Sequence, residues 1–296
     1  MKKAAQFIVY LLFLAFAGLF AIIPFRLLYV LSDGVYGLLF YVVGYRKKVV
    51  YQNLKASFPE KSEKEIKSIA KKFYKHLADL FVESLKGFTM SKASVIKRHK
   101  LADEGIGDEY HRQGKSVMVV VGHYNNWEWG SMSGGLQLES PVMVLYKPLS
   151  NKFIDNFLER RRRNFGSELV AIRQTARAFE LRKNTPYFYI LAADQSPGKT
   201  KRAYWIDFLN QDTACLHGPE TYARKYNLVV IYLEIKKLKR GFYQMVPNVI
   251  TEDPSKLEDG EIVKRYMKLL EGSIKNQPEY WLWSHRRWKK KRKPQT

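Results

Sequence analysis

A histidine and a glutamate five residues apart are the side chains best placed to do chemistry in this sequence. His123 and Glu128 follow the apolar run 117–121. Five residues turn a regular helix by about 500°, so the two side chains can converge only if His123 lies in a turn and Glu128 in the first turn of a helix. In that arrangement the carboxylate can orient one imidazole nitrogen while the other takes a proton from a hydroxyl. A capping glutamate beside a hydrogen-bonded, non-catalytic histidine is the alternative.

Short apolar runs alternate with amphipathic stretches over most of the chain, which predicts an α/β fold with a mixed sheet flanked by helices. The predicted strands cover residues 116–121, 142–146, 187–193 and 228–235, with 241–246 as a hairpin partner of the last. The predicted helices run from a capping box at 62–65 to Gly87 and over 151–163, 175–183 and 261–274. Ligands of open α/β sheets bind at the carboxyl ends of strands, where His123 falls.

The N-terminal residues predict a membrane anchor. Residues 4–25 have Gln6 as their clearest polar interruption, and a helix of this length reaches roughly 33 Å, enough to cross a bilayer core of about 30 Å. A cleaved signal peptide ending near Ala17 and a buried core helix are the alternatives. A second apolar stretch, 27–43, contains Ser32 and Asp33 and predicts an interfacial or re-entrant helix. We therefore divide the chain into an anchor (1–45) and a domain with a basic tail (46–296).

The charge balance predicts negatively charged partners. The chain carries 51 Lys and Arg against 28 Asp and Glu, a net charge of +23, which favours anionic lipids or an acidic protein. No recognised nucleic-acid-binding motif accompanies the charge, so nucleic acid is not expected as a partner. The single cysteine, Cys215, excludes an internal disulfide, and the spacing of Cys and His predicts no metal site.

Five segments in order along the chain resemble the late acyltransferases of lipid A biosynthesis, the lauroyl and myristoyl transferases. This family is related to the lysophospholipid acyltransferases. The similar segments are His123-x-x-x-x-Glu128 after its apolar strand, residues 53–63, Tyr146-Lys147-Pro148, Ala193-Asp194-Gln195, and residues 283–289. The resemblance covers most of the chain and implies a glycerolipid acyltransferase-like fold.

The resemblance implies that a fatty acyl group moves from a thioester, usually on acyl carrier protein, to a hydroxyl of a lipid A precursor. It places the reaction at the cytoplasmic face of the bacterial inner membrane and requires no cofactor. His123 would be the general base and Glu128 its partner. Donors for the oxyanion at the thioester carbonyl would come from Asn125 or Asn126 beside them. The acceptor glycolipid, acyl carrier protein and anionic lipids are the expected partners.

Further contacts to substrate are expected from three places. The arginine of the family falls on Arg160, or on Arg162 if the register slips by two within the run 160–163. The family's aspartate falls on Asp194, for which a turn-capping role is the alternative. Lys147 stands where the family has an arginine and lacks its planar fork for phosphate.

A second departure is Phe208-Leu209-Asn210, where the family tends to have Phe-Phe-Gly. The departures at Lys147 and Asn210 keep other functions open. A lysophospholipid or an amino-acid lipid is an alternative acceptor. From a different class, a non-catalytic membrane protein that binds polyanions would also explain the charge.

Overall fold

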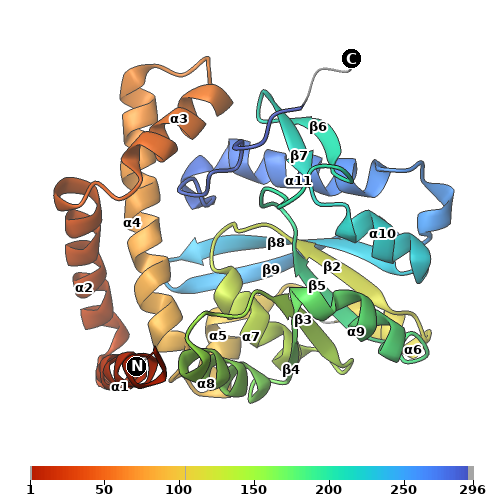
Figure 1. The fold of residues 1–296 in the computed structure, drawn as a ribbon, viewed down its shortest axis with the longest axis horizontal. Helices are drawn as coiled ribbons and strands as arrows, with labels where there is room; N and C mark the ends of the chain where they lie inside the picture. Colours follow the sequence, from red (N-terminus) through yellow and green to blue (C-terminus); the bar gives the residue numbers. More distant parts are fainter. Residues whose placement is uncertain (1, 104, 293–296) are drawn as a thin grey trace.

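A seven-stranded mixed sheet forms the centre of the computed structural model, which describes residues 2–103 and 105–292 (Figure 1). The strand order is β1-β9-β8-β2-β5-β3-β4, and neighbours run parallel except for the antiparallel pair β8 and β9. The strands are β1 (His99–Leu101), β2 (Val117–Val121), β3 (Val142–Tyr146), β4 (Ser167–Ala171), β5 (Phe188–Ala192), β8 (Val229–Lys239) and β9 (Phe242–Thr251). A separate hairpin joins β6 (Tyr204–Phe208) to β7 (Gln211–Cys215). The predicted mixed α/β fold is thus confirmed.

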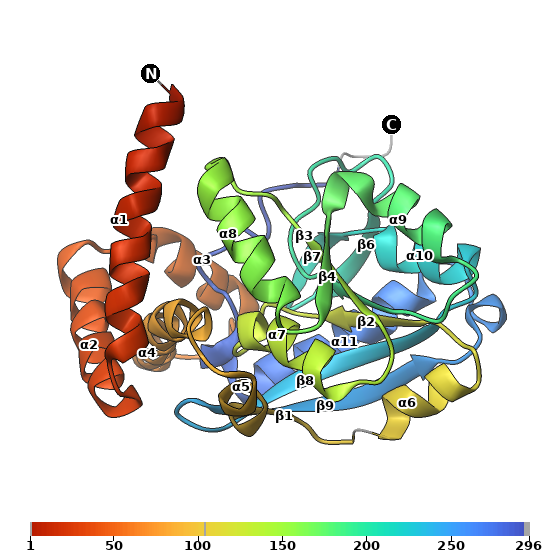
Figure 2. The same cartoon turned by 90° about the horizontal axis from the view of Figure 1, so that it is seen from below.

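Helices cover both faces of this sheet (Figures 1 and 2). In chain order, the α-helices of the described residues are α1 (Lys2–Ile22), α2 (Phe25–Gly37), α3 (Lys47–Ser57), α4 (Glu63–Gly87), α5 (Lys92–Arg98), α6 (Gly105–Arg112), α7 (Trp127–Gln137), α8 (Lys152–Arg163), α9 (Thr175–Arg182), α10 (Gly218–Lys225) and α11 (Glu261–Asn276). The capping box at Ser62 and Glu65 begins α4 as predicted. The predicted helices over 151–163, 175–183 and 261–274 correspond to α8, α9 and α11.

The central strand β2 is apolar throughout because both of its faces are buried. Side chains alternate between the faces of a strand, and here Met118 and Val120 join the core beneath α11 while Val117, Val119 and Val121 join the core on the opposite face. Every residue of β2 is buried. A parallel strand covered on both faces needs apolar residues at every position, so the run carries no alternation.

Two apolar helices lead into the domain. Lys3–Ile22 and Phe25–Val42, the second including a π-helical turn at Leu38–Val42, are both long and apolar enough to cross a membrane. They are consistent with a membrane anchor. Ser32 and Asp33, which predicted an interfacial or re-entrant helix, face α4, against which α2 lies lengthwise in Figure 1.

The first helix also contacts the α/β domain, because α1 lies beside α8 (Figure 2). Phe7 and Phe13 meet Phe153 and Phe157 with ring centroids 5.3 and 5.7 Å apart. At Gln6, the polar interruption of the apolar run, the backbone carbonyl accepts a hydrogen bond from Asn151 Nδ2 at 2.8 Å and the side-chain amide donates to the carbonyl of Ser150 at 3.3 Å.

The C-terminal basic segment packs against the rest of the chain at Arg287 and Trp288. Arg287 is buried and donates to the carbonyl of Ala214 at 2.7 Å, and Trp288 donates to Thr213 Oγ1 at 2.7 Å. The segment packs on the β6–β7 hairpin because these carbonyl and hydroxyl groups satisfy the guanidinium and indole donors. Lys293, the last cation of the run, lies outside the described residues.

Candidate active site

The turn between β2 and α7 carries the proposed catalytic residues, as the spacing predicted. β2 ends at Val121, α7 begins at Trp127, His123 lies in the turn and Glu128 in the first turn of the helix. Asn125 adopts a left-handed conformation (φ 54°), which asparagine tolerates better than most residues. Asn126 caps α7, because its Oδ1 accepts a hydrogen bond from Trp129 N at 2.9 Å.

The imidazole of His123 is held by Asp194. Asp194 Oδ1 lies 2.5 Å from His123 Nδ1, and Asp194 Oδ2 accepts the backbone N–H of His123 at 2.9 Å. Trp281 Nε1 donates to the same Oδ2 at 2.8 Å. Asp194 follows β5, the parallel neighbour of β2, so both residues reach the same edge of the sheet. The aspartate therefore fixes both the orientation of the ring and the backbone of the turn.

Asp194 and His123 each stabilise the charged form of the other. Burial raises the pKa of Asp194, but His123 and the hydrogen bonds from His123 and Trp281 outweigh burial and lower that pKa to about 2. Burial lowers the pKa of His123, yet the charge and hydrogen bond of Asp194, with a contribution from Glu128, raise it overall above 6.5. An ionised aspartate at Nδ1 leaves Nε2 as the nitrogen that exchanges a proton with a substrate. Nε2 faces the side-chain amide of Gln195 at 3.0 Å.

The expected contact between Glu128 and the imidazole is replaced by an ion pair. Glu128 Oε2 lies 2.5 Å from Arg162 Nη2 on α8, while Asp194 occupies Nδ1 of His123. Glu128 points from the first turn of α7 into the cavity that His123 also lines. Arg162 Nε is buried and makes no hydrogen bond within the described residues.

The four consecutive arginines of α8 point in different directions, because successive residues on a helix diverge by about 100°. Arg162 lines the cavity, whereas Arg160 is exposed. Arg161 donates to the carbonyl of Phe88 at 2.6 Å and Arg163 pairs with Glu159 at 2.8 Å. Of the two arginines that the sequence nominated, the structure brings only Arg162 to the cavity.

Asn126 and Lys147, the other nominated residues, differ in their access to the cavity. Asn126 is buried and both ends of its side-chain amide are engaged, Oδ1 with Trp129 and Nδ2 with Glu83. The expected oxyanion contact from the Asn126 side chain is therefore replaced by capping and anchoring. The side-chain donor of Asn125 is also engaged, since Nδ2 donates to the carbonyl of Ile235 at 2.7 Å, while its buried Oδ1 has no hydrogen-bond partner within the described residues. Lys147 follows β3 and lines the cavity from an exposed position.

The cavity beside His123 has a volume of about 480 Å³ and is lined by both polar and apolar side chains. Its polar lining includes His123, Glu128, Ser131, Lys147, Asp155, Arg162 and Gln195. Its apolar lining includes Val121, Trp127, Val144, Leu145, Leu149, Leu158, Leu169, Ile172, Ile190, Ala192, Leu233 and Ile235. Gly130, Ile190 and Leu233 also line a smaller, almost entirely apolar cavity that reaches Leu138 and Phe188. Polar groups near an apolar cleft suit a molecule with a reactive head and a hydrocarbon tail.

Trp281 is the site residue that sequence reasoning did not assign. Leu282 N donates to the carbonyl of His123 at 3.2 Å and Asn125 N donates to the carbonyl of Tyr280 at 3.0 Å, so the C-terminal segment supports the catalytic turn. The available signal was the apolar Trp281-Leu282-Trp283 immediately before a basic run.

Within residues 2–103 and 105–292, no three His, Cys, Asp or Glu side chains group in a way that could hold a metal ion.

A histidine–aspartate pair thus lies at the edge of an α/β sheet, beside a cavity with a largely apolar lining, in a chain with two apolar N-terminal helices. Comparison with known proteins gives the family. Residues 1–290 match the family model of the bacterial lipid A biosynthesis acyltransferases, and the chain belongs to this family. The chain is also 25% identical over 275 residues to the lipid A biosynthesis lauroyltransferase of Escherichia coli (strain K12), covering 90% of this chain and 87% of that protein. Family membership supports acyltransferase activity and implies a glycolipid acceptor, and the two apolar helices are consistent with membrane association.

Proposed function

We propose that this protein transfers a fatty acyl group from an acyl carrier protein thioester to a hydroxyl of a lipid A precursor, at the cytoplasmic face of the inner membrane and without a cofactor. The observation that carries the proposal is the His123–Asp194 pair, at 2.5 Å, opening on a cavity with an apolar interior. The family and the Escherichia coli relative support the reaction class.

The proposed chemistry is a direct attack. His123 Nε2 takes the proton of the acceptor hydroxyl as the hydroxyl oxygen bonds to the thioester carbonyl carbon. Asp194 stabilises the imidazolium that forms. The carbon–sulfur bond then breaks, and the imidazolium returns the proton to the departing thiolate. The products are an ester and the free thiol of the carrier, with no acyl group on the enzyme.

The Glu128–Arg162 pair supplies the second half of the proposed site. Its carboxylate and guanidinium lie at the polar part of the cavity, and the Arg162 Nε donor is unsatisfied within the described residues. A guanidinium binds phosphate or a carbonyl oxygen that gains negative charge. We assign Arg162 to one of these oxygens on the substrate and Glu128 to holding Arg162 in place. Lys147 adds a cation near the mouth.

The basic surface fits both partners. A net charge of +23 raises the encounter rate with an acidic carrier protein and with phosphorylated lipid. The apolar cleft holds the acyl chain during transfer.

The test is the product made by purified, detergent-solubilised protein. The protein is incubated with the lauroyl thioester of acyl carrier protein and, in parallel, with a lipid A precursor or a lysophospholipid, and the lipids are analysed by mass spectrometry. The proposal predicts a lipid A precursor heavier by one lauroyl ester. Acylation of the lysophospholipid alone would replace the acceptor, and binding of anionic lipid without any transfer would overturn the enzymatic function.

A further inference from the structure

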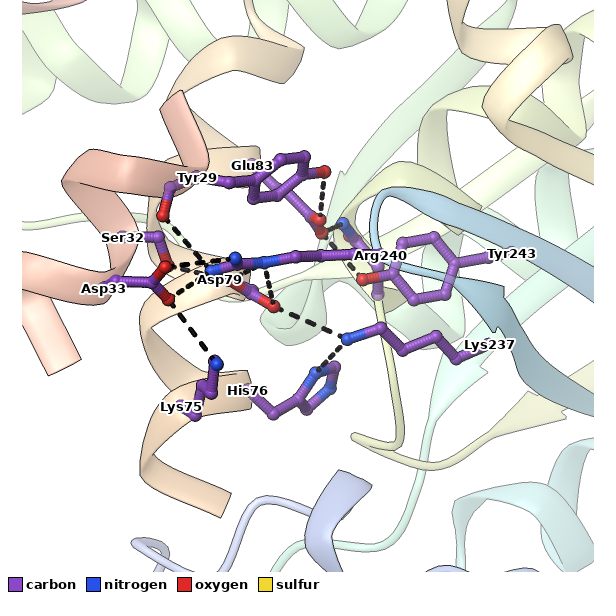
Figure 3. A network of polar contacts seen from close by, with 11 residues as sticks. Tyr29, Ser32, Asp33, Lys75, His76, Asp79, Glu83, Lys237, Arg240 and Tyr243 are labelled. Atoms are coloured by element: carbon purple, nitrogen blue, oxygen red, sulfur yellow. Dashed lines mark hydrogen bonds and ion pairs between the residues drawn. The ribbon is translucent and has the colours of Figure 1, made fainter. Parts of the chain in front are cut away.

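A buried carboxylate outside the catalytic cavity holds the catalytic turn from behind. Glu83, close to the C-terminal end of α4, is completely buried, and its side chain accepts three hydrogen bonds from three different parts of the chain. Tyr29 of α2 donates to Oε1 at 2.8 Å. Asn126 Nδ2 and Tyr243 of β9 donate to Oε2 at 2.7 and 2.8 Å. Figure 3 shows Glu83 between Tyr29 and Tyr243.

These contacts connect an apolar N-terminal helix to the active site. Asn126 lies between His123 and Glu128 and caps α7, whose first turn carries Glu128. The carbonyl of Glu83 also accepts the indole N–H of Trp129 at 2.9 Å, one residue beyond Glu128. Glu83 thus fixes the first turn of α7 at two points, and Tyr29 links the same carboxylate to α2, a candidate membrane helix.

We propose that Glu83 is a positioning residue, which keeps Glu128 and its ion pair with Arg162 directed into the cavity. Through its hydrogen bond with Tyr29, Glu83 also makes this geometry depend on how α2 packs against α4. This inference rests on the proposed function. Glu83 does not line the catalytic cavity and acts through Asn126 and Trp129.

The charges around Glu83 make its ionisation sensitive to pH. Burial and the nearby Asp79 raise the pKa of Glu83 to about 7, while the hydrogen bonds from Tyr243 and Tyr29 and the charge of Lys237 oppose this rise. The charged groups near it are Asp79 on α4, Arg98 at the end of α5 and Lys237 on β8. Arg240 in the β8–β9 turn pairs with Asp79, and the neutral His99 contacts the backbone carbonyl of Asn126. All three side-chain partners of Glu83 are donors, so protonation of the carboxylate disturbs one of these bonds.

The experiment compares Glu83→Gln with Glu220→Gln in the acyl transfer assay. Glu220 is a matched control, because it is an equally buried carboxylate that binds the backbone N–H groups of Ile262 and Val263, on the far face of the sheet. For Glu83→Gln we expect kcat about 10-fold lower near pH 8.5, with KM for the thioester within about 2-fold of wild type. Glu220→Gln is expected to lower the melting temperature and leave kcat of the folded protein unchanged.

The ratio of wild-type to Glu83→Gln kcat, measured as a function of pH, distinguishes a positioning role from a general loss of stability. Glutamine imitates the protonated carboxylate, so the ratio of wild-type to Glu83→Gln kcat should fall towards 1 as the pH drops below about 7. His123 titrates in both proteins and cancels from the ratio.

A second variant keeps the proposal testable if Glu83→Gln fails to fold. Tyr29→Phe removes only the bond from α2 and should lower kcat about 3-fold, with Tyr41→Phe, an exposed residue of the π-helical turn, as its control. Wild-type kcat in Glu83→Gln and Tyr29→Phe, or a ratio that does not change with pH, would overturn the proposal. Absence of transfer by the wild-type protein would instead refute the proposed function.

Discussion

Asp194 and Glu83 are both buried carboxylates that hold the same turn, yet their pKa values move in opposite directions. Asp194 meets the imidazole of His123, and its pKa falls to about 2. Glu83 meets only neutral donors and has Asp79 one turn away, and its pKa rises to about 7. Burial acts on both in the same direction, so the partner decides the ionisation. Near neutral pH Asp194 is therefore ionised, whereas Glu83 can take up a proton.

Replacing the base should have the largest effect. His123→Ala removes the group that accepts the hydroxyl proton, and we expect kcat to fall by about 10³-fold. The measurement is transfer of a radiolabelled acyl group by purified protein. His111→Ala is the control, because His111 lies on α6, does not line the cavity, and hydrogen-bonds with Ser140 in the loop after α7. A His123→Ala protein with more than a tenth of wild-type turnover would remove His123 from the mechanism.

Breaking the ion pair should have a smaller effect. Glu128→Gln leaves Arg162 without its counter-charge, and we expect kcat/KM for the lipid acceptor to fall by about 10- to 100-fold. Glu159→Gln, which breaks the exposed pair with Arg163 on the same helix, is the matched control. Equal effects of the two substitutions would mean that the Glu128–Arg162 pair only stabilises α8.

Removing the indole donor to Asp194 should weaken the pair only in part. Trp281→Phe keeps the packing and deletes the hydrogen bond to Oδ2, and we expect kcat to fall about 3- to 10-fold. Trp283→Phe removes a comparable buried indole donor whose acceptor is the carbonyl of Pro278. It should therefore affect stability rather than kcat, and the reverse result would contradict a role for Trp281 at the site.

The smallest effect is expected far from the turn. Ser62→Ala removes half of the capping box of α4 and should lower the free energy of unfolding by about 1 kcal/mol. The turnover of folded protein should not change, because Ser62, the N-cap of α4, lies about six helical turns before Glu83. Denaturant unfolding and the transfer assay check both parts, and a loss of turnover without a loss of stability would argue against this separation.

The sequence predicted the elements that local patterns encode. The strand–turn–helix around His123 follows from an apolar run, a turn and a capped helix, and both α4 and β2 lie where the patterns placed them. The pairing of Glu128 with His123 was expected because the two residues are close in sequence. Asp194, brought to the imidazole by the parallel pairing of β2 and β5, takes that place instead. Contacts across 71 residues depend on strand order, which one sequence does not encode locally.

The surroundings of the site were less predictable for the same reason. The rotation of α8 against its neighbours determines which of the four consecutive arginines faces the cavity. In the structure Arg162 lines the cavity and Arg160 does not. Trp281 and Glu83 reach the turn from distant parts of the chain. Local spacing carries no signal for either contact.

The most direct test of the account is the pH dependence of a single turnover in Asp194→Asn. A neutral imidazole is the active base, and because Asp194 raises the pKa of His123 above 6.5, the wild-type rate should fall as the pH drops through a value higher than that of a free histidine. In Asp194→Asn the rate should be about 100-fold lower and its acid limb should move to lower pH. An acid limb at the wild-type position in Asp194→Asn would show that Asp194 does not control the group that takes the proton.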